Sequence, residues 1–350
     1  MAKKENTNIS YDSFTESLKT GQIGSLYFLH GEERYLLDHS LSELRQLLCP
    51  NGLDSFNYRR YEGRSIELDD LENAIDTLPA FAERTLIEIH DYDIFNSTKK
   101  ESKGIDKQRL SEIFTDLPDY VCIAVVFNTI PYKPDGRVKL DKEILSHANV
   151  IDFPIQEQSK LLNWISRRFA ALHKRISKAD AQYLALITDG HMASLVGEIE
   201  KICAYSIGDA IMREDIDAVV TPVISAFAYK LTDALLENKH MTAMSVLDEL
   251  FQMREPAQKI IFNISLKMRQ FLAARICIEN KMDRKALTTM CGIRYDFQAR
   301  FLMDSARSTT LSKCRRAVIL CSQAAYDLNS GSEPEARLVE LIAQLAYLGD

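Results

Sequence analysis

The chain lacks the apolar runs that a membrane protein needs. Nowhere in its 350 residues do the roughly 18 consecutive apolar residues of a spanning helix occur. The opening Met1-Ala2-Lys3-Lys4-Glu5-Asn6 also leads into no apolar segment of the kind that forms a signal peptide. We therefore expect a cytoplasmic protein with no membrane partner.

Paired metal-binding patterns are missing as well. The seven cysteines include no Cys-x-x-Cys pair, and the seven histidines form no His-Glu-x-x-His motif and no cluster with cysteine. These absences argue against the common zinc sites, so we expect no metal. We expect the cysteines to be buried, reduced thiols, and the spacing of Cys314 and Cys321 places both on one helix face.

Signatures of nucleophilic catalysis are absent too. The sequence contains no Gly-x-Ser-x-Gly elbow and no Cys–His pairing at a recognisable spacing. Its carboxylates are abundant, but most fall in helix-face patterns that are normally solvated. We expect no catalytic site.

An excess of positive charge is also missing. The 43 Lys and Arg residues stand against 50 Asp and Glu, which gives a net charge of −7. This balance argues against a protein that wraps nucleic acid over its whole surface. Five short basic clusters remain, each more typical of a solvated face, which together permit contacts that position phosphates without reading sequence: Arg59-Arg60, Lys99-Lys100-Lys103, Arg167-Arg168, Lys174-Arg175 and Arg315-Arg316.

The chain does contain enough apolar material for two or three domains, with 46% hydrophobic and 27% charged residues. Up to residue 155, short apolar runs alternate with helical patterns, which predicts an α/β domain with a parallel sheet. We expect residues 1–10 to fray and residues 96–108 to form a loop. The expected strands cover 25–30, 57–62, 85–89, 120–127 and 150–153, and the expected helices 11–18, 36–48, 66–75 and 140–147.

Beyond Pro154 the apolar spacing becomes helical throughout. Residues 156–222 predict three or four helices, which is a small helical domain. Residues 223–350 predict seven more helices and no strand, which is a helical bundle. Thr221-Pro222 provides the boundary between these two parts. We therefore expect three domains, at 1–155, 156–222 and 223–350.

The stretch from Leu26 to Leu37 has the order of a nucleotide-binding element: an apolar strand, a glycine turn and an amphipathic helix. A phosphate-binding loop needs a Gly-rich backbone, a Lys and a Ser or Thr. Here the turn is Gly31-Glu32-Glu33, and its two carboxylates would repel a triphosphate. We interpret it as a degenerate phosphate loop that binds no cofactor. The following helix carries a core-facing stripe: Leu36, Leu37, Leu41, Leu44, Leu47 and Leu48.

Other positions that an ATPase of this layout uses are also altered. Such an enzyme carries Asp-Glu after its third strand to hold Mg²⁺, whereas this sequence reads His90-Asp91-Tyr92-Asp93. We interpret Asp91 and Asp93 as solvated turn residues. Asn128 follows the fourth strand, where these ATPases often sense the γ-phosphate. Without a phosphate cradle, we expect Asn128 to cap the turn.

Binding is the activity that remains, and one loop suggests it. Leu78-Pro79-Ala80-Phe81 precedes the third strand, where a loop is normally polar. In one interpretation Phe81 packs under the sheet edge. In the other it is an exposed apolar anchor for a partner, since large aromatic side chains dominate binding hot spots.

With this layout, the chain resembles the delta-subunit family of bacterial DNA polymerase III, a component of the sliding-clamp loader. The resemblance runs over essentially the whole chain. It rests on the order and spacing of five motifs, each weak alone: residues 29–37 (Leu-His-Gly-Glu-Glu-Arg-Tyr-Leu-Leu), 77–86 (Thr-Leu-Pro-Ala-Phe-Ala-Glu-Arg-Thr-Leu), Leu140-Asp141-Lys142, the helix from Leu195 to Lys201, and the run from Phe227 to Leu235.

The resemblance implies an AAA+ protein with a RecA-like α/β domain, a helical lid and an all-α collar that joins a loader pentamer. It implies that this subunit binds the sliding clamp and opens its ring, while gamma/tau and delta-prime type subunits join it through the collar. It further implies membership of a nucleotidyltransferase holoenzyme that acts on primed DNA.

The resemblance also implies a clamp-binding site. In the family, an apolar pair in the loop before the third strand enters a hydrophobic pocket of the clamp, and the matching residues are Ala80 and Phe81. Ala80 departs from the larger aliphatic residue expected there, which places more of the affinity on Phe81. Leu78 or Pro79 is positioned to compensate.

Two other functions stay open. An active AAA+ ATPase is disfavoured by the missing Lys and Ser/Thr in the turn at Gly31. A helical scaffold protein unrelated to replication would have no affinity for a clamp ring.

Overall fold

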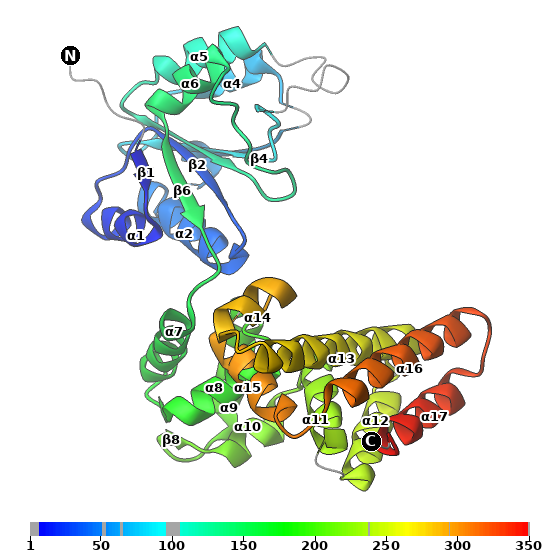
Figure 1. Ribbon diagram of the computed structural model, residues 1–350. Helices are drawn as coiled ribbons and strands as arrows, with labels where there is room; N and C mark the ends of the chain where they lie inside the picture. The colour runs from blue at the N-terminus through cyan, green and yellow to red at the C-terminus, as the bar shows by residue number, and fades with distance from the viewer. Residues whose placement is uncertain are drawn as a thin grey trace. The chain divides into compact units, whose positions relative to one another are not determined.

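The computed structural model describes residues 7–50, 54–63, 66–95, 106–236, 239–293 and 295–348. The chain divides into two compact units, Met1–Ile155 and Gln156–Asp350 (Figure 1). The first unit is α/β, and the second is almost entirely helical, so the fold class predicted from the sequence is confirmed.

The first unit is built on a six-stranded parallel sheet in the order β1-β6-β2-β5-β4-β3. Strands β4 and β5 are buried along their whole length, as expected for central strands of a parallel sheet. The strands are β1 (Thr7–Ile9), β2 (Leu26–Gly31), β3 (Tyr58–Glu62), β4 (Thr85–His90), β5 (Val121–Val126) and β6 (Asn149–Phe153).

Helices cover both faces of this sheet. Figure 1 shows α4, α5 and α6 on one face and α1 and α2 on the other. Their bounds, with the short α3 before β3, are α1 (Tyr11–Thr20), α2 (Arg34–Leu48), α3 (Asp54–Asn57), α4 (Leu68–Asp76), α5 (Lys107–Thr115) and α6 (Lys139–His147). The predicted leucine stripe of α2 is buried except for Leu47, which is 41% exposed at the margin of the stripe.

Three elements of this unit differ from the sequence prediction, which contains no helix at α3. Residues 7–9 do not fray but form β1, which pairs with β6 through its backbone and so leaves little apolar signal. Helix α5 begins inside the expected 96–108 loop, where the Asp106 side chain accepts the backbone N–H of Arg109 at 3.1 Å. Leu110 and Phe114, one turn apart, bury its inner face. The other residues of that loop, 96–105, and residues 1–6 lie outside the described part of the chain.

Aromatic packing consolidates the face under α5. The ring of Phe28 on β2 lies 5.7 Å from Phe95, 6.0 Å from Phe127 and 6.3 Å from Phe114, measured between centroids. All three pairs are edge-on, the preferred geometry for aromatic rings. These four rings therefore join β2, the ends of β4 and β5, and α5 into one core.

A buried charge network lies on the opposite face, under α2. Glu88 is fully buried, and its carboxylate accepts bonds from the Arg45 guanidinium at 2.8 and 3.0 Å, from the Tyr58 hydroxyl at 2.9 Å and from His90 at 3.1 Å. Burial alone would raise the pKa of Glu88, but the bonds from His90 and Arg45 outweigh burial and lower that pKa. The carboxylate therefore stays charged and ties α2 and β3 to β4.

The second unit contains eleven helices within its described residues and one two-stranded parallel pair, β7 (Arg175–Ile176) with β8 (Ala210–Ile211). The helices are α7 (Gln158–Ala171), α8 (Lys178–Ile187), α9 (Met192–Tyr205), α10 (Arg213–Val219), α11 (Ile224–Leu236), α12 (His240–Gln252), α13 (Ala257–Glu279), α14 (Arg284–Cys291), α15 (Asp296–Ala306), α16 (Leu311–Asn329) and α17 (Pro334–Ala346). No single described helix is long and apolar enough to span a membrane; one bent pair, 213–219 with 224–235, meets the length and composition test together.

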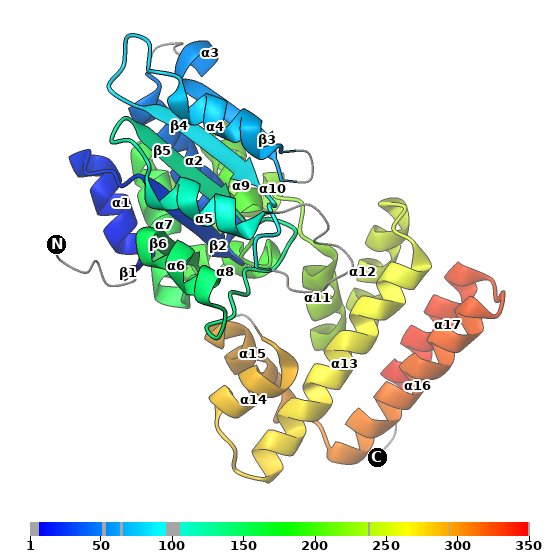
Figure 2. The same cartoon turned by 90° about the horizontal axis from the view of Figure 1, so that it is seen from above.

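Helix α13 is shared by two apolar cores. Its first half shares a core with α11, α12, α16 and α17, and Figure 2 shows α16 running alongside it. Its second half packs with α14 and α15. As predicted, Cys314 and Cys321 share the inner face of α16, where they are 5% and 1% exposed.

The turn between α8 and α9 packs against the start of α15. Gly190 has a φ of +65°, and a Cβ there would lie 2.3 Å from the Tyr295 ring. The Tyr295 hydroxyl donates to the Gly190 carbonyl at 3.1 Å, and the Gln298 amide donates to Asp189 at 3.0 Å. These contacts cross the domain boundary expected near residue 222, whose placement remains a prediction.

We predict that Glu88→Gln lowers the free energy of unfolding of the first unit by about 3 kcal/mol, because it breaks a buried ion pair. Since the folded pKa of Glu88 is lowered, its contribution is present above its ordinary pKa of 4.5 and is lost as pH falls through the folded value. Hydrogen exchange of peptides covering β4, followed against urea at several pH values, measures both effects. Glu62→Gln, at an exposed carboxylate on β3, is the control; equal losses for both variants would contradict the prediction.

Candidate functional site: an exposed apolar loop

The direction of the strands separates two candidate sites. In a parallel sheet, loops that precede strands lie at one edge and loops that follow strands lie at the other. The 77–84 loop precedes β4, whereas the turn at Gly31 and the residues Asp91 and Asn128 follow β2, β4 and β5. The apolar loop and the nucleotide-like turn therefore occupy opposite edges of the sheet.

The 77–84 loop presents its large apolar side chains to solvent. Phe81 is 90% exposed and Leu78 is 70% exposed, while Pro79 and Ala80 are half-buried. Phe81 does not pack under the sheet edge. Its φ is +58°, a left-handed conformation that residues other than glycine rarely adopt. The site residues predicted from the sequence thus lie together on one loop, with Phe81 the most exposed of them.

A buried amide holds the backbone of this loop. The Asn57 Nδ2 donates to the Ala80 carbonyl at 2.7 Å, and Asn57 Oδ1 accepts the Ala80 N–H, also at 2.7 Å. Asn57 is only 1% exposed. Its backbone carbonyl accepts a bond from the Cys49 thiol at 3.4 Å, at the end of α2. Both polar groups of Ala80 are therefore bonded by one side chain, next to Phe81.

An arginine fixes the other end of the loop. Arg84 donates to the carbonyls of Ile23 at 2.6 Å, Val121 at 2.8 Å and Gly24 at 3.0 Å. These carbonyls lie before and at the start of β2 and β5. No sequence pattern predicts a role for Asn57 or Arg84. Asn57 lies 23 residues from Ala80 and carries no motif that could reveal the contact.

At the opposite edge, the turn after β2 is too short for a phosphate cradle. Only Glu32 and Glu33 separate β2 from α2. Gly31 has a φ of +135°, and a Cβ there would lie 2.3 Å from the Phe153 carbonyl oxygen, so glycine permits close approach to β6. Glu33 is 4% exposed, and its N–H donates to the same carbonyl at 2.9 Å. Of the two carboxylates expected to repel phosphate, only Glu32 is exposed.

The polar groups at this edge bond to one another. The Arg34 guanidinium donates to the Phe127 carbonyl at 2.7 Å and to the Asn128 side chain at 3.3 Å, and also contacts the Asn128 carbonyl. The Asn128 amide lies 3.0 Å from His90 Nδ1. The positions where ATPases place a phosphate sensor and a metal-binding acid are here occupied by a closed hydrogen-bond network.

Asp91 differs from its predicted role as a solvated turn residue. Its carboxylate accepts the backbone N–H groups of Asn128 at 2.7 Å, Thr129 at 2.8 Å and Ile130 at 3.4 Å. Burial would raise the pKa of Asp91, but these bonds, led by Thr129, lower it overall. Asp91 therefore organises the turn after β5. Asp93 is half-buried. Among the described residues, no three His, Cys, Asp or Glu side chains gather as metal ligands.

A groove of about 580 Å³ lies beside Gly31. Its wall contains the His30 ring, stacked on Tyr132 with centroids 4.1 Å apart. Burial lowers the pKa of His30, so the ring is neutral near pH 7 despite Asp152 at 3.5 Å. The exposed acids of the groove are Glu32 and Asp152. Arg34 also lines the groove, but its guanidinium is bonded to Phe127 and Asn128.

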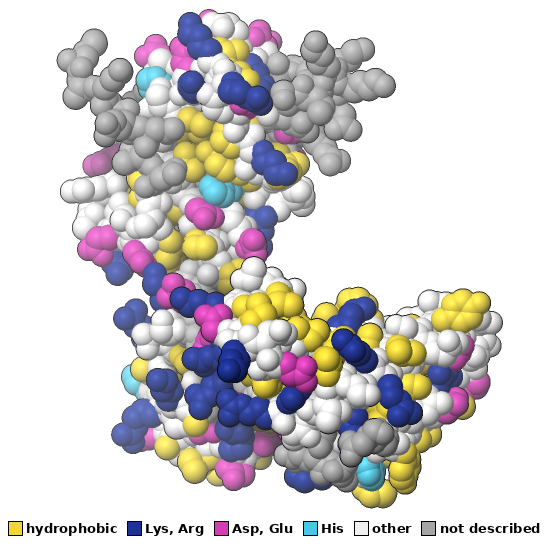
Figure 3. All heavy atoms as spheres, in the orientation of Figure 1, with side chains coloured by type: hydrophobic (Ala, Val, Ile, Leu, Met, Phe, Trp, Pro, Cys, Tyr) yellow, Lys and Arg dark blue, Asp and Glu magenta, His cyan; other side chains and the backbone are white. Residues whose placement is uncertain are grey.

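The basic clusters are only partly used within the chain: Arg167, Arg315 and Arg316 are exposed. Figure 3 shows Lys and Arg side chains gathered over the part of the second unit that contains α7 to α9. There Arg168 pairs with Glu200 at 3.3 Å, and Lys174 donates to two carbonyls, of Ser206 and Gly208. Lys99, Lys100 and Lys103 lie outside the described residues.

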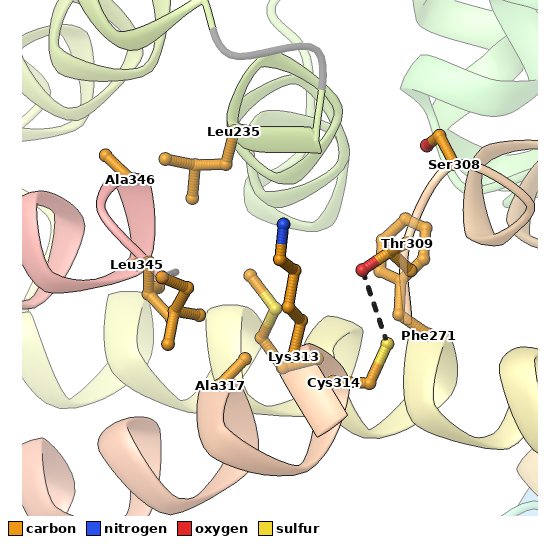
Figure 4. Close-up of a pocket in the computed structure, with 11 residues that line it drawn as sticks. Leu235, Phe271, Ser308, Thr309, Lys313, Cys314, Ala317, Leu345 and Ala346 are labelled. Carbon is orange, nitrogen blue, oxygen red and sulfur yellow. Dashed lines mark hydrogen bonds between the residues drawn. The ribbon is translucent and has the colours of Figure 1, made fainter. Parts of the chain in front are cut away.

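The second unit also contains a small pocket among α11, α13, α16 and α17. Figure 4 shows Lys313 pointing into it and the Cys314 thiol 3.9 Å from the Thr309 hydroxyl. Its volume is about 110 Å³. Ligand pockets usually occupy about 300–1,000 Å³, so this space is too small for a nucleotide.

Comparison with known proteins identifies the family from both parts of the chain. Residues 27–154 match the model described as "DNA polymerase III, delta subunit", and residues 226–344 match "DNA polymerase III delta subunit, C-terminal domain".

Relatives and a solved structure agree with these matches. The DNA polymerase III subunit delta of Bacillus subtilis (strain 168) is 25% identical over 332 residues, covering 93% of this chain and 94% of that protein. The probable DNA polymerase III subunit delta of Aquifex aeolicus (strain VF5) is 22% identical over 252 residues, covering 69% of each. The solved structure of the Bacillus subtilis DNA clamp loader delta protein shares the fold, with a TM-score of 0.66 and 22% identity over 96% of this chain and 99% of that one.

We predict that the isolated protein shows no saturable ATP binding even at about 1 mM nucleotide, because Glu32 faces the turn and no backbone cradle exists. Isothermal titration calorimetry with MgATP measures this directly. Micromolar affinity, competed by ADP, would overturn the interpretation of the turn at Gly31 and favour an active AAA+ ATPase.

Proposed function

Because the chain belongs to the DNA polymerase III delta subunit family, we propose that it binds the sliding clamp through the 78–81 loop and opens that ring without hydrolysing ATP. The observation that carries the clamp-binding proposal is the loop itself. Phe81 is 90% exposed on a backbone held by buried Asn57. A large aromatic side chain on an ordered loop is typical of a binding hot spot.

The energetics of the loop favour Phe81 and Leu78 as the main contacts. Burying a Phe or Leu side chain that was exposed stabilises a complex by about 1.5–3 kcal/mol. Ala80 offers a single methyl group, worth about 0.8 kcal/mol by the same measure. Ala80 is also half-buried already, and its backbone bonds to Asn57. We therefore place most of the affinity on Phe81, with Leu78 and Pro79 completing the apolar surface.

Ring opening follows from differential binding. A protein shifts an equilibrium between closed and open rings only by as much as it binds the open form better. In the proposed arrangement Phe81 anchors the clamp. Helix α4, which ends two residues before Leu78, is then the element that meets a second surface of the ring and acts as the wedge.

The remaining partners are proposed on the family relationship and on the second unit. We propose that the lid covers residues 156–222 and the collar residues 223–350. Helices α13 and α16 of the collar carry exposed apolar side chains, Phe262, Ile319 and Tyr326, which are 60–68% exposed. Such a surface suits packing against gamma/tau and delta-prime type subunits. Those subunits would hydrolyse ATP, and the cytoplasmic holoenzyme would act on primed DNA.

We predict that Phe81→Ala weakens binding to the organism's own sliding clamp by about 2 kcal/mol or more, because it removes the anchor side chain. Surface plasmon resonance with immobilised clamp measures the affinity, and Phe262→Ala, an exposed phenylalanine of the second unit, is the matched control.

Two outcomes would contradict this proposal. Unchanged affinity for Phe81→Ala would remove Phe81 from the site. Absence of clamp binding by the unaltered protein would instead favour a scaffold function unrelated to replication.

A further inference from the structure

The backbone of Phe81 has a left-handed conformation that packing of its side chain does not explain. With a φ of +58°, Phe81 occupies a region that a non-glycine residue adopts only when its surroundings impose it. The side chain is 90% exposed, so apolar packing does not hold it in place. The constraint therefore comes from the backbone on either side.

That constraint is the Asn57 amide. Its two bonds to Ala80, both 2.7 Å, reproduce the paired N–H and C=O contacts that a neighbouring strand would make. Asn57 is itself fixed, because it is buried, ends α3 and directly precedes β3. The residue immediately before Phe81 is thus attached to the framework of the sheet.

We propose that Asn57 is a positioning residue that holds Phe81 in its clamp-binding conformation before the clamp arrives. This inference rests on the proposed clamp-binding function. A flexible loop binds with an affinity reduced by the fraction of time it spends in the competent conformation, and a held loop avoids that reduction.

The chemistry of the site explains why asparagine is suited to it. A primary amide carries a donor and an acceptor on one planar group, which matches the carbonyl and the N–H of Ala80. In Asn57→Asp, an ionised carboxylate can still accept the Ala80 N–H. Its second oxygen, however, would face the Ala80 carbonyl oxygen and repel it. A protonated carboxyl restores a donor at the same position.

The test compares Asn57→Ala with the unaltered full-length protein in clamp binding. We expect affinity to fall about tenfold or more, as for the loss of two ordinary hydrogen bonds that order the loop. In the background of Phe81→Ala the same change should have a much smaller further effect, since the main anchor is gone and only Leu78 and Pro79 remain to be positioned. Asn280→Ala, at an exposed asparagine that bonds the Ile276 carbonyl on α13, is the matched control. Additive losses in the double variant would overturn the proposal.

If Asn57→Ala fails to fold, Asn57→Asp provides a second test of the positioning role. Asn57→Asp should bind poorly at pH 8 and recover toward unaltered affinity as pH is lowered and its carboxyl gains a proton. The unaltered protein, measured in parallel, corrects for other titrations. Protonation would also relieve a purely structural defect, so urea unfolding of Asn57→Asp is measured over the same pH range. Recovery of affinity with unchanged stability supports positioning, and the absence of recovery would count against it.

A readout in the free protein separates this inference from the proposed function. Fluorine NMR of a trifluoromethyl-phenylalanine placed at position 81 should show a narrower, shifted line when Asn57 is replaced. If the line responds but the unaltered protein binds no clamp, the positioning role stands and the proposed function falls. If the protein binds the clamp and Asn57→Ala changes neither line nor affinity, the positioning role is wrong.

Discussion

All six strands of the first unit run in the same direction, and the placement of its functional groups depends on that constraint. Parallel strands send the loops before them to one edge and the turns after them to the other. The exposed apolar loop and the nucleotide-like turn are therefore separated by the length of the strands. Each edge has its own supporting bonds, Asn57 and Arg84 at one and Arg34 with Asn128 at the other. A change at the turn can leave the loop intact.

The charge network under α2 extends to the carboxyl ends of the strands, next to the nucleotide-like turn. In an ATPase, polar groups at the carboxyl ends of the strands are arranged around phosphate and Mg²⁺. Here His90 links Glu88 to Asn128, and Asn128 links onward to Arg34. Each polar group is bonded within the protein, which is what buried polar groups require. The side chains beside the turn are therefore bonded to one another.

The features visible in the sequence were those that repeat locally. The apolar run of β5 and most of the α2 leucine stripe were predicted because burial imposes a period on neighbouring residues. Strand β1 escaped prediction because its pairing uses backbone groups that no side chain reveals. The roles of Asn57, Arg84 and Asp91 also escaped, since each bonds residues 23 to 61 positions away along the chain. The sequence predicted the loop residues 78–81 as a candidate site, but it did not predict the bonds from Asn57 that fix the loop backbone.

Helix α13 has a mechanical consequence for the second unit. At 1.5 Å per residue its 23 residues form a rod of roughly 35 Å. Because Met268 packs in one core and Phe271 in the other, a tilt of the rod displaces both cores at once. The bond from Tyr295 to Gly190 carries such a movement on to the turn before α9. A displacement of α16 would thus reach the α8–α9 turn through one continuous helix and the Tyr295–Gly190 bond.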